Sequence, residues 1–330
     1  MRQKKSSKTQ SLPTISWSLK SNRDTVIPML PENLRLLLEK QKYRIVGNHS
    51  AVKICTWTKK SIKGEGVCYK EKFYGIKSHR CLQMTPAVAW CPNKCVFCWR
   101  ATDRTLGPEI KESLDTPEDI LEGSIAAQRN LLTGLKGFEG TDIKKWKEAQ
   151  DPNQIAISLT GEPTAYPLIS DFIDLCNRRK MTTFLVTNGQ FPERLENIAK
   201  PYQLYLSLDA PTKEMYRKID MPMFKDYWER FTKTVDIMSS FNSRKTVRLT
   251  LVKGINMSHI KDYAKMIEKI NPNFVEVKAY MHVGFSKYRL PIEAMPLHDE
   301  VKEFSEKLKT ELSYKIKDES RPSRVVLLER

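Results

Sequence analysis

The sequence predicts an α/β protein whose main body is a partial (β/α)6 barrel of the TIM type. Three observations support this. Short apolar runs alternate with longer amphipathic stretches after residue 82, the alternation repeats six times, and polar or Gly/Pro signals follow successive apolar runs. Such alternation is typical of a parallel sheet with crossover helices. Because the loops after the strands form the working face of a barrel, we expect the functional residues there.

The barrel is expected to begin after two different segments. Residues 1–30 are polar and basic and predict a flexible tail, and residues 31–81 predict an N-terminal extension. Within the extension, 31–42 predicts a helix with Pro31 near its start, whereas 43–81 is expected to be irregular. The barrel then spans 82–312, and 313–330 forms a C-terminal extension.

Six strands and six helices are predicted from the apolar periodicity. The strands are expected at 82–90, 154–160, 182–187, 203–208, 246–252 and 274–280. The helices are expected at 117–135, 167–180, 191–199, 224–240, 258–270 and 297–311. The first of these helices has Thr116 as its N-cap and Pro117 at its first position, which are favoured start signals.

The net charge of +17 is unevenly distributed. Residues 1–110 hold 21 Lys and Arg against 7 Asp and Glu, so they carry +14 of the total. A basic surface in one third of a chain favours a polyanionic partner such as a nucleic acid. The alternative is a basic tail and an ordinary solvated face. The sequence has no apolar run of 18 residues and no secretory signal, so we expect a cytoplasmic protein without a membrane span.

Six of the seven cysteines lie between Cys55 and Cys98. A secreted disulfide scaffold would be shorter and would carry a signal peptide, so clustered thiols here favour metal binding. Cys176 lies in an amphipathic helical pattern and is expected to be a small core residue.

Three cysteines follow the first predicted strand with the spacing C-x3-C-x2-C: Cys91, Cys95 and Cys98. Three thiolates hold three irons of a [4Fe–4S] cluster and leave the fourth iron open. An open iron can chelate S-adenosylmethionine (SAM), and one electron then yields a 5′-deoxyadenosyl radical. The alternative is a structural zinc site, whose fourth ligand would be Cys81 or His79.

This motif resembles that of the radical SAM superfamily. The resemblance implies that residues at later strand ends contact SAM, and these are Gly161, Glu162, Pro163, Asn188, Ser207 and Asp209. Taken singly, each is more often a turn residue than a ligand.

A second set of cysteines, Cys55, Cys68 and Cys81, has the regular spacing C-x12-C-x12-C. Spacings this wide do not form one local zinc knuckle, and they suit a cluster that ties a loop-rich segment to the barrel. Three unrelated buried thiols, or a zinc site completed by a histidine, are the alternatives.

The sequence around both sets resembles the tRNA 4-demethylwyosine synthases. The runs that carry the likeness are CYKEKFYGIKSHRCLQMTPAVAWCPNKCVFCWR (68–100), SLTGEPTAYP (158–167), FLVTNGQFPE (184–193), YLSLDAP (205–211) and EVKAYMHVGFSKYRLP (276–291). The likeness covers residues 35–311. It implies a radical SAM barrel with an N-terminal cluster-binding extension, two [4Fe–4S] clusters and SAM.

The reaction implied by this resemblance is a carbon–carbon lyase-type condensation in wyosine biosynthesis. N1-methylguanosine at position 37 of phenylalanine tRNA reacts with pyruvate to give 4-demethylwyosine. Eukaryotic members carry a flavodoxin-like domain, which is not found in this sequence. We therefore expect the archaeal form, working as a monomer with an external electron donor such as a ferredoxin or a flavodoxin.

The family is understood to hold pyruvate as an imine on a lysine. Lys70 is assigned this role because it follows the second-set ligand Cys68 by two residues, and Lys278, near the end of the sixth strand, is its rival. An imine makes the attacked carbon more electrophilic and anchors the small acid.

Basic residues on either side of the expected cavity are candidates for gripping the tRNA backbone. They are Lys53, Lys59, Lys60, Lys63, Arg80, Arg100, Lys287 and Arg289. Two other hypotheses stay open at this point. One is a radical SAM enzyme acting on another RNA base, a protein or a small molecule, and the other is a non-catalytic RNA-binding protein with structural zinc.

Overall fold

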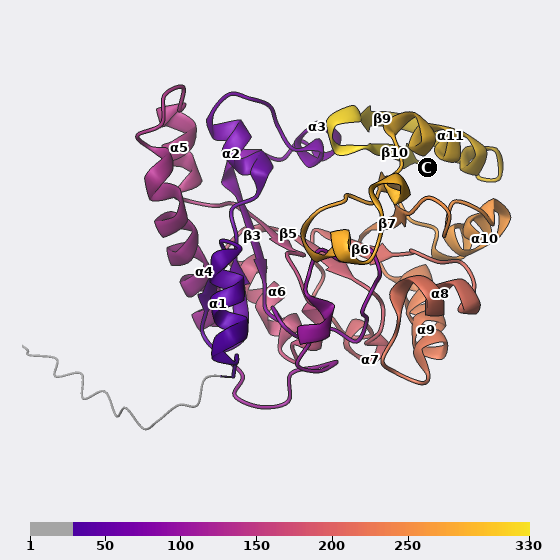
Figure 1. Cartoon of the computed structure of the whole chain (residues 1–330), viewed down its shortest axis with the longest axis horizontal. Helices are drawn as coiled ribbons and strands as arrows, with labels where there is room; N and C mark the ends of the chain where they lie inside the picture. The colour runs from indigo at the N-terminus through magenta and orange to yellow at the C-terminus, as the bar shows by residue number, and fades with distance from the viewer. Residues whose placement is uncertain (1–28) are drawn as a thin grey trace, which may run out of the picture.

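The structure is a computed structural model that describes residues 29–330 (Figure 1). Residues 1–28 of the expected basic tail lie outside the described part of the chain. A single mixed sheet runs through the molecule in the order β1-β2-β3-β4-β5-β6-β7-β8-β10-β9. Its strands are β1 Arg44–Val46, β2 Ser50–Val52, β3 Cys81–Thr85, β4 Gln154–Ile157, β5 Thr182–Thr187, β6 Gln203–Ser207, β7 Arg244–Leu251, β8 Phe274–Ala279, β9 Lys315–Ser320 and β10 Val325–Glu329.

The six central strands, β3 to β8, pair in parallel and in sequence order. At each end of this unit the sheet continues with an antiparallel hairpin, β1–β2 beside β3 and β10–β9 beside β8. The strand order does not close on itself, so the sheet is an open, curved barrel. The predicted partial (β/α)6 barrel is confirmed.

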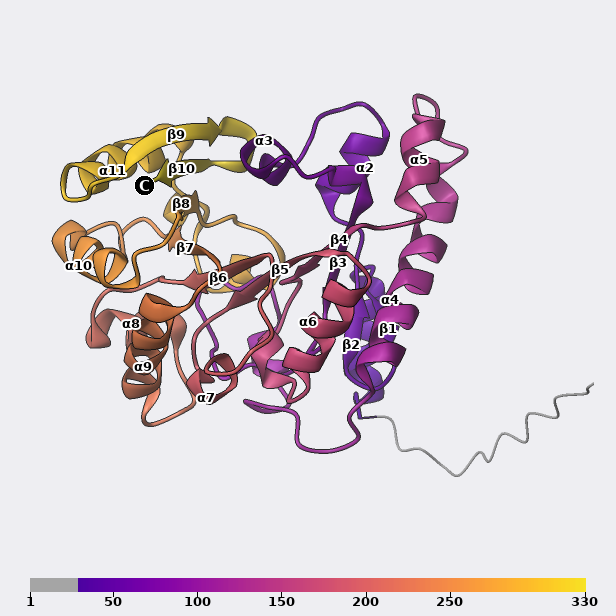
Figure 2. The same ribbon diagram turned by 180° about the vertical axis from the view of Figure 1, so that it is seen from behind.

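The helices lie on the outside of this sheet, as Figures 1 and 2 show. They are α1 Glu32–Lys40, α2 Thr56–Ile62, α3 Tyr69–Tyr74, α4 Pro117–Leu132, α5 Ile143–Ala149, α6 Ile169–Arg178, α7 Pro192–Leu195, α8 Lys213–Asp220, α9 Tyr227–Ser240, α10 Ile260–Ile270 and α11 His298–Thr310. Thr116 caps α4 as predicted, because its side-chain oxygen accepts a hydrogen bond from the Asp119 amide at 3.2 Å.

The core lies between the helices and the outer face of the sheet. Helix α6 illustrates it: Phe172, Ile173 and Cys176 are fully buried on one side of the helix. These spacings follow the 3.6-residue period of an amphipathic helix. The expectation that Cys176 is a core residue is therefore confirmed.

The segment 43–81, expected to be irregular, contains ordered elements instead. Strands β1 and β2 add to the barrel edge, where Ala51 pairs with Thr85, and α2 and α3 follow them. Each element is too short to produce a clear periodic pattern. The first barrel strand is also shorter than predicted, since it ends at Thr85 before Pro86, which cannot donate to a sheet.

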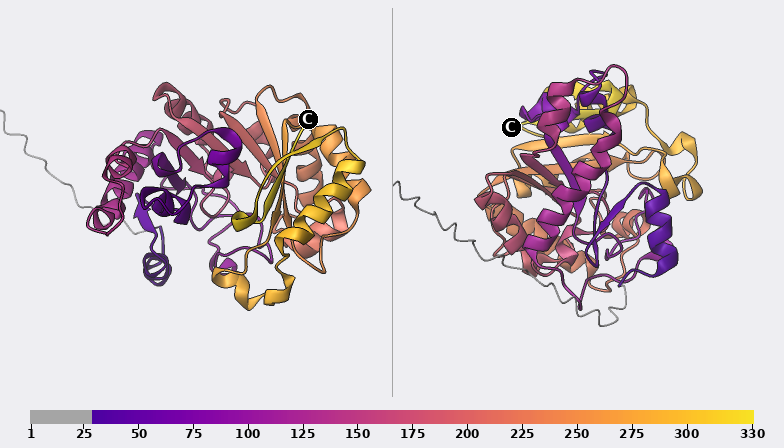
Figure 3. Two further views of the ribbon diagram at one scale, coloured as in Figure 1. Left: turned by 90° about the horizontal axis from the view of Figure 1, so that it is seen from above. Right: turned by 90° about the vertical axis from the view of Figure 1, so that its left-hand side faces the viewer.

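The C-terminal hairpin was not predicted either. Strand β9 has the sequence KIKDES, whose polar residues carry no strand signal, and it pairs only with β10. Figure 3 shows this hairpin and α11 at one end of the curved sheet, with α1, α2, α4 and α5 at the other. In the described residues, no helix is both long and apolar enough for a membrane crossing.

Replacing Phe172 with alanine should remove a large, fully buried ring from the centre of the helix–sheet interface. We expect the free energy of unfolding to fall by about 3–5 kcal/mol, the usual cost of emptying such a site. Urea denaturation measures it. Phe138→Ala is the matched control, since Phe138 is 57% exposed, and it should cost far less. Equal losses in the two variants would contradict the assigned core.

Candidate functional site

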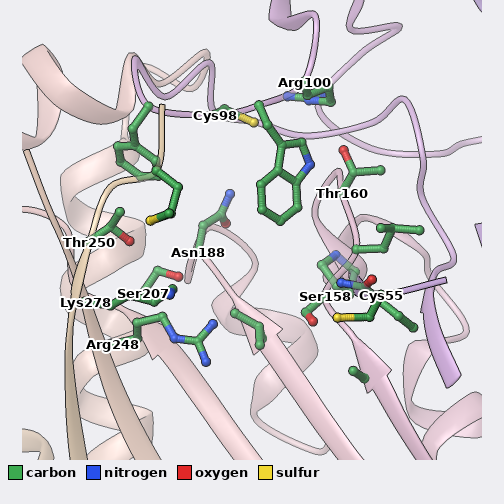
Figure 4. Close-up of a pocket in the computed structure, with 18 of the residues that line it drawn as sticks. Cys55, Cys98, Arg100, Ser158, Thr160, Asn188, Ser207, Arg248, Thr250 and Lys278 are labelled. Carbon is green, nitrogen blue, oxygen red and sulfur yellow. The ribbon is translucent and has the colours of Figure 1, made fainter. Parts of the chain in front are cut away.

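One cavity of about 420 Å³ lies inside the barrel, and all six clustered cysteines line it. Figure 4 shows Cys98 and Cys55 on different sides of this cavity, with Asn188, Ser207 and Arg248 along a third side. The two sets of thiols that were separate motifs in the sequence therefore share one chamber.

The two sets enter the chamber from opposite ends of the strands. Cys91, Cys95 and Cys98 belong to the loop after β3, at the carboxyl end. Cys81 is the first residue of β3, and Cys68 directly precedes α3. The ring of Tyr74 in α3 packs against Phe274, the first residue of β8, with centroids 5.3 Å apart. Helix α3 thus covers the amino-terminal end of the barrel and brings the second set with it.

The loop that carries the first set is fixed by backbone hydrogen bonds. The Lys94 amide donates to the Asp220 carbonyl at 3.0 Å and the Val96 amide donates to the Ile219 carbonyl at 2.9 Å, both at the end of α8. Arg289 donates to the carbonyls of Val96 and Cys98. The three thiols are therefore held in place by the protein backbone.

Arg100 and Arg289 do not occupy the exposed positions expected of residues that grip tRNA. Only 7% of Arg100 is exposed, and its Nη2 donates to the Asn93 carbonyl at 3.1 Å. Arg289 is half-buried, and its hydrogen bonds go to the cysteine loop. Arg100 lines the cavity and Arg289 supports the cysteine loop, and their roles as RNA contacts stay predictions.

Burial makes thiolates costly in this cavity unless a cation binds them. It raises the pKa of Cys68 to about 11, that of Cys81 to about 12 and that of Cys91 to about 12, and it holds the pKa of Cys95 well above its usual value. Thiolates, not thiols, ligate metals, so a bound metal group must compensate for this desolvation.

The donor sets fit iron–sulfur clusters better than zinc. Within residues 29–330, no three His, Cys, Asp or Glu side chains are arranged to hold one metal ion. A four-iron cluster binds one thiolate on each iron, so its ligands lie farther apart than those of a single zinc ion. His79, the alternative zinc ligand, is not among the residues that line the cavity, and its Nε2 lies 2.7 Å from Glu148. In the described residues, Nε and Nη1 of Arg100 are buried without a hydrogen-bond partner, as expected beside an anionic ligand set.

The residues expected to contact SAM all line the cavity at the carboxyl ends of the strands. These are Gly161, Glu162, Pro163, Asn188, Ser207 and Asp209. Asn188 also reaches the first cysteine set, because its Nδ2 lies 3.7 Å from Cys91 Sγ. The strand ends and the first cysteine set therefore form one continuous wall.

The carboxylate of Glu162 organises this wall. It accepts hydrogen bonds from the hydroxyl of Thr187 at 2.7 Å, the hydroxyl of Thr164 at 2.5 Å and the amide of Asn188 at 2.8 Å. Asp209 similarly accepts from the amide of Thr250 at 2.9 Å. Both carboxylates tie neighbouring strand ends together.

Gly161 is required at its position. Its φ is +68°, and a Cβ there would lie 1.8 Å from the carbonyl oxygen of Ala87. Any side chain would both strain the backbone and collide with the loop that leads into the first cysteine set.

A buried polar network was missed in the sequence. Glu276 on β8 pairs with Arg248 on β7, whose Nε and Nη2 lie 2.9 and 2.7 Å from Oε2. The hydroxyls of Tyr69, Tyr74 and Tyr205 also donate to Glu276, at 3.2, 2.7 and 3.2 Å. The available signal was a charged residue in the interior of each strand, Arg248 in β7 and Glu276 in β8. The register pairs Arg248 directly with Glu276.

Both candidate lysines line the cavity beside this network. Lys70 is buried, and its Nζ lies 4.5 Å from the ring centroid of Phe184 and 4.7 Å from that of Tyr205. Lys278 Nζ donates to the Ser323 carbonyl at 2.7 Å. Burial and the nearby Arg248 lower the pKa of Lys70, and they lower that of Lys278 to about 8. Both amines therefore lose protons more readily than ordinary lysines.

The remaining basic candidates lie around the second cysteine set and the opposite rim. Lys59 and Lys287 are exposed. Lys53, Lys60 and Lys63 lie over the rings of Tyr43, Trp57 and Phe138, at 4.7, 5.2 and 4.3 Å from the centroids. Arg80 pairs with Asp151 at 2.8 Å. Trp57 also lines the cavity, so this basic surface adjoins the chamber.

Known proteins share both the sequence and the fold. Residues 140–267 match the family model of the radical SAM superfamily, and residues 269–330 match the model for wyosine base formation. The S-adenosyl-L-methionine-dependent tRNA 4-demethylwyosine synthase of Pyrococcus abyssi is 51% identical over 308 residues, which are 92% of this chain and 90% of that protein.

The chain belongs to the tRNA 4-demethylwyosine synthase family. The member from Methanocaldococcus jannaschii is 41% identical over 91% of this chain and 97% of its own length. A solved structure of TYW1 with a lysine-pyruvate adduct bound is 39% identical, with a TM-score of 0.83, and the match covers 91% of this chain and 96% of that one.

Membership of the tRNA 4-demethylwyosine synthase family confirms several predictions. The chain is a radical SAM enzyme of wyosine base formation, as the cysteine spacing and the surrounding sequence indicated. Radical SAM chemistry uses SAM and an iron–sulfur cluster. The alternative of a non-catalytic RNA-binding protein with structural zinc is excluded.

Gly161→Ala should distort the wall of the cavity where SAM is expected to bind. The left-handed backbone alone costs about 1–3 kcal/mol for a residue with a side chain, and the contact with Ala87 adds to that. We expect a lower melting temperature and weaker SAM binding, measured by thermal denaturation and equilibrium dialysis. Gly134→Ala is the control, since its added methyl group meets no atom within 4 Å. SAM binding of normal strength in Gly161→Ala would contradict the assignment.

Proposed function

We propose that this enzyme condenses N1-methylguanosine at position 37 of phenylalanine tRNA with pyruvate, and that it uses two [4Fe–4S] clusters and SAM to form 4-demethylwyosine. The observation that carries the proposal is the shared chamber. Two sets of three thiols and a buried lysine, Lys70, line one cavity inside the barrel. The names of its relatives support the tRNA substrate.

Cys91, Cys95 and Cys98 would hold the cluster that works with SAM, and Cys55, Cys68 and Cys81 would hold the second. When bound, the first cluster supplies the electron that cleaves SAM and releases a 5′-deoxyadenosyl radical. The protein's own residues contribute there by holding the reacting groups in position and by excluding water. Glu162 ties together the strand ends beside the first cysteine set, and the buried walls of the cavity limit the access of water to the reacting groups.

Lys70 is proposed to carry pyruvate. Its Nζ attacks the keto carbon, a C–N bond forms, and the keto oxygen leaves as water after taking up protons, so the product is an imine. Lys70 follows Cys68 by two residues and faces the chamber between aromatic rings. A related TYW1 has been solved with a lysine-pyruvate adduct bound, which supports an imine on one of the two cavity lysines.

Two contacts favour Lys70 over Lys278. Lys278 Nζ donates to the Ser323 carbonyl at 2.7 Å, an interaction that holds it at the wall of the cavity. In the described part of the chain, Lys70 Nζ makes no hydrogen bond, and the rings of Phe184 and Tyr205 lie beside it. An amine without a hydrogen bond is the better nucleophile, since no donor–acceptor contact must break before it attacks.

The target base must leave its stack to reach the chamber. The basic surface formed by Lys53, Lys59, Lys60 and Lys63 is proposed to bind the anticodon-stem backbone, with Lys287 on the opposite rim. Arg80 is a weaker candidate, because Asp151 already neutralises it. We further propose that the enzyme is a monomer and that a ferredoxin or a flavodoxin supplies its electrons.

Iron counting after anaerobic reconstitution tests the two-cluster proposal. The unmodified protein should bind about eight irons, and Cys68→Ala and Cys91→Ala should each bind about four. Cys176→Ala is the control and should keep about eight, because Cys176 lies in the core away from the cavity. Four irons in the unmodified protein, or zinc in place of iron, would contradict the two-cluster proposal.

Anaerobic turnover tests the reaction itself. Methylated tRNA, SAM, pyruvate and dithionite should give 4-demethylwyosine by nucleoside mass spectrometry, and leaving out pyruvate should abolish the product. Lys70→Arg should form none, since a guanidinium cannot make the imine, whereas Lys278→Arg should retain product. Lys265→Arg, at a side chain 77% exposed on α10, is the neutral control. Product from Lys70→Arg but not from Lys278→Arg would transfer the imine to Lys278.

A further inference from the structure

We propose that Arg248 is the binding residue for the carboxylate of lysine-bound pyruvate, and that Glu276 is the positioning residue that aims it. The inference rests on the proposed function, because it takes pyruvate on Lys70 as its starting point. It adds a recognition element that neither cysteine set nor either lysine provides.

The guanidinium of Arg248 is held from one side only. Nε and Nη2 both face Glu276, and Nη2 also donates to the hydroxyl of Tyr69 at 2.9 Å. Within residues 29–330, Nη1 makes no hydrogen bond. The Arg248 side chain keeps 16% of its surface exposed, whereas that of Glu276 has none. Because Arg248 lines the cavity, its free edge faces the chamber (Figure 4).

Glu276 has no remaining capacity to bind a ligand. Its two oxygens accept from three tyrosine hydroxyls and from Arg248. A fully buried carboxylate is stable only when paired and hydrogen-bonded in this way. Its effect is to fix the plane of the guanidinium. A planar, pre-oriented guanidinium matches a carboxylate, with which it forms two parallel hydrogen bonds.

Arg248 is a neighbour of Lys70 in the cavity, as the cation that binds the carboxylate of a Lys70 imine has to be. Lys70 Nζ and Arg248 Cζ are each 4.7 Å from the centroid of the same ring, Tyr205. In the imine, the carboxylate is attached to the carbon that bonds to Nζ, so its partner must lie only a few ångströms from Nζ. Tyr69, the residue before Lys70, is itself hydrogen-bonded to Arg248. The helix that carries the nucleophile is thereby joined to the cation.

SAM also carries a carboxylate, but the position of Arg248 favours pyruvate. Arg248 lies within β7, three residues before its last residue, Leu251. The residues assigned to SAM lie at or beyond the strand ends, next to the first cysteine set. Arg248 pairs in register with Ser207, one of these residues, but its hydrogen bond to Tyr69 joins it to α3, the helix that carries Lys70.

Reductive trapping separates these roles without measuring turnover. The reconstituted protein is treated anaerobically with cyanoborohydride and either pyruvate or acetone, and Lys70 is read by peptide mass spectrometry. Hydride reduces the C=N bond and leaves a carboxyethyl or an isopropyl group on Nζ. Acetone is the probe without a carboxylate. Only the trapping of pyruvate should therefore depend on a carboxylate contact with Arg248.

We expect Arg248→Gln to raise the half-saturating pyruvate concentration by about 10- to 100-fold, the range for a lost charge-assisted hydrogen bond. Arg248→Lys should show a smaller rise, because it keeps a charge for Glu276 but lacks the planar fork. It is the safeguard if Arg248→Gln does not fold. Trapping of acetone should fall less than that of pyruvate, because the loss of the nearby positive charge raises the pKa of Lys70 for both probes, and the affinity for SAM should be unchanged. Arg179→Lys is the control, since Arg179 pairs with Glu122 on the outer surface.

Each other outcome has a distinct meaning. Equal loss of pyruvate and acetone trapping would mean that Arg248 only holds Lys70 in place, and the inference would fail. Weakened SAM binding with normal pyruvate trapping would assign Arg248 to the carboxylate of SAM and would also overturn it. If Lys70 in the unmodified protein is not labelled by pyruvate, the imine of the proposed function is wrong, whatever Arg248 does.

Discussion

The desolvation of charge inside the barrel is the constraint on which the rest of the structure depends. Six thiols, two arginines, two glutamates, an aspartate and two lysines line or adjoin one cavity in a sheet whose other face is packed with apolar side chains. An unpaired charge there would cost several kcal/mol, so each must have a partner. Glu276 and Arg248 meet this requirement within the protein. The thiols meet it only with a bound metal group.

This constraint gives a reason for the additions at the two ends of the sheet. A (β/α)6 unit leaves both the side and the amino-terminal end of its interior open. The hairpin β1–β2 extends one edge, and β10–β9 extends the other. Helix α3 then covers the amino-terminal end, with Tyr69 and Tyr74 turned inward to Glu276. The segments outside the six-strand unit therefore supply most of the enclosure of the second cysteine set.

The sequence predicted the parts of this molecule that have a regular period or a fixed spacing. Strand β5 was located to the residue, and all six cysteines that were picked out by their spacing line the cavity. What could not be predicted is the direction in which a side chain points. Arg100 adjoins Cys98 in a basic segment, and only the fold shows that its side chain turns inward.

The same limit applies to the network around Glu276. Arg248 and Glu276 lie in strands that hold other charged residues as well, and a single sequence does not reveal that these two are paired in register. Strand β9 was missed for another reason, since its polar residues gain their order only from pairing with β10. In both cases the information lies in tertiary contacts, which local pattern does not contain.

The contact between α3 and the C-terminal hairpin has a consequence for how the chamber is completed. Tyr69 and Phe73 pack with Val325 and Leu327, and Lys72 Nζ donates to the carbonyl of Glu319, 247 residues further along the chain. A contact of such sequence separation forms late, because a long loop must close first. Until β10 has joined the sheet, α3 lacks this contact, and the amino-terminal end of the barrel is uncovered. The end of the chamber that holds Cys55, Cys68 and Cys81 is therefore covered only when the two ends of the described chain have come together.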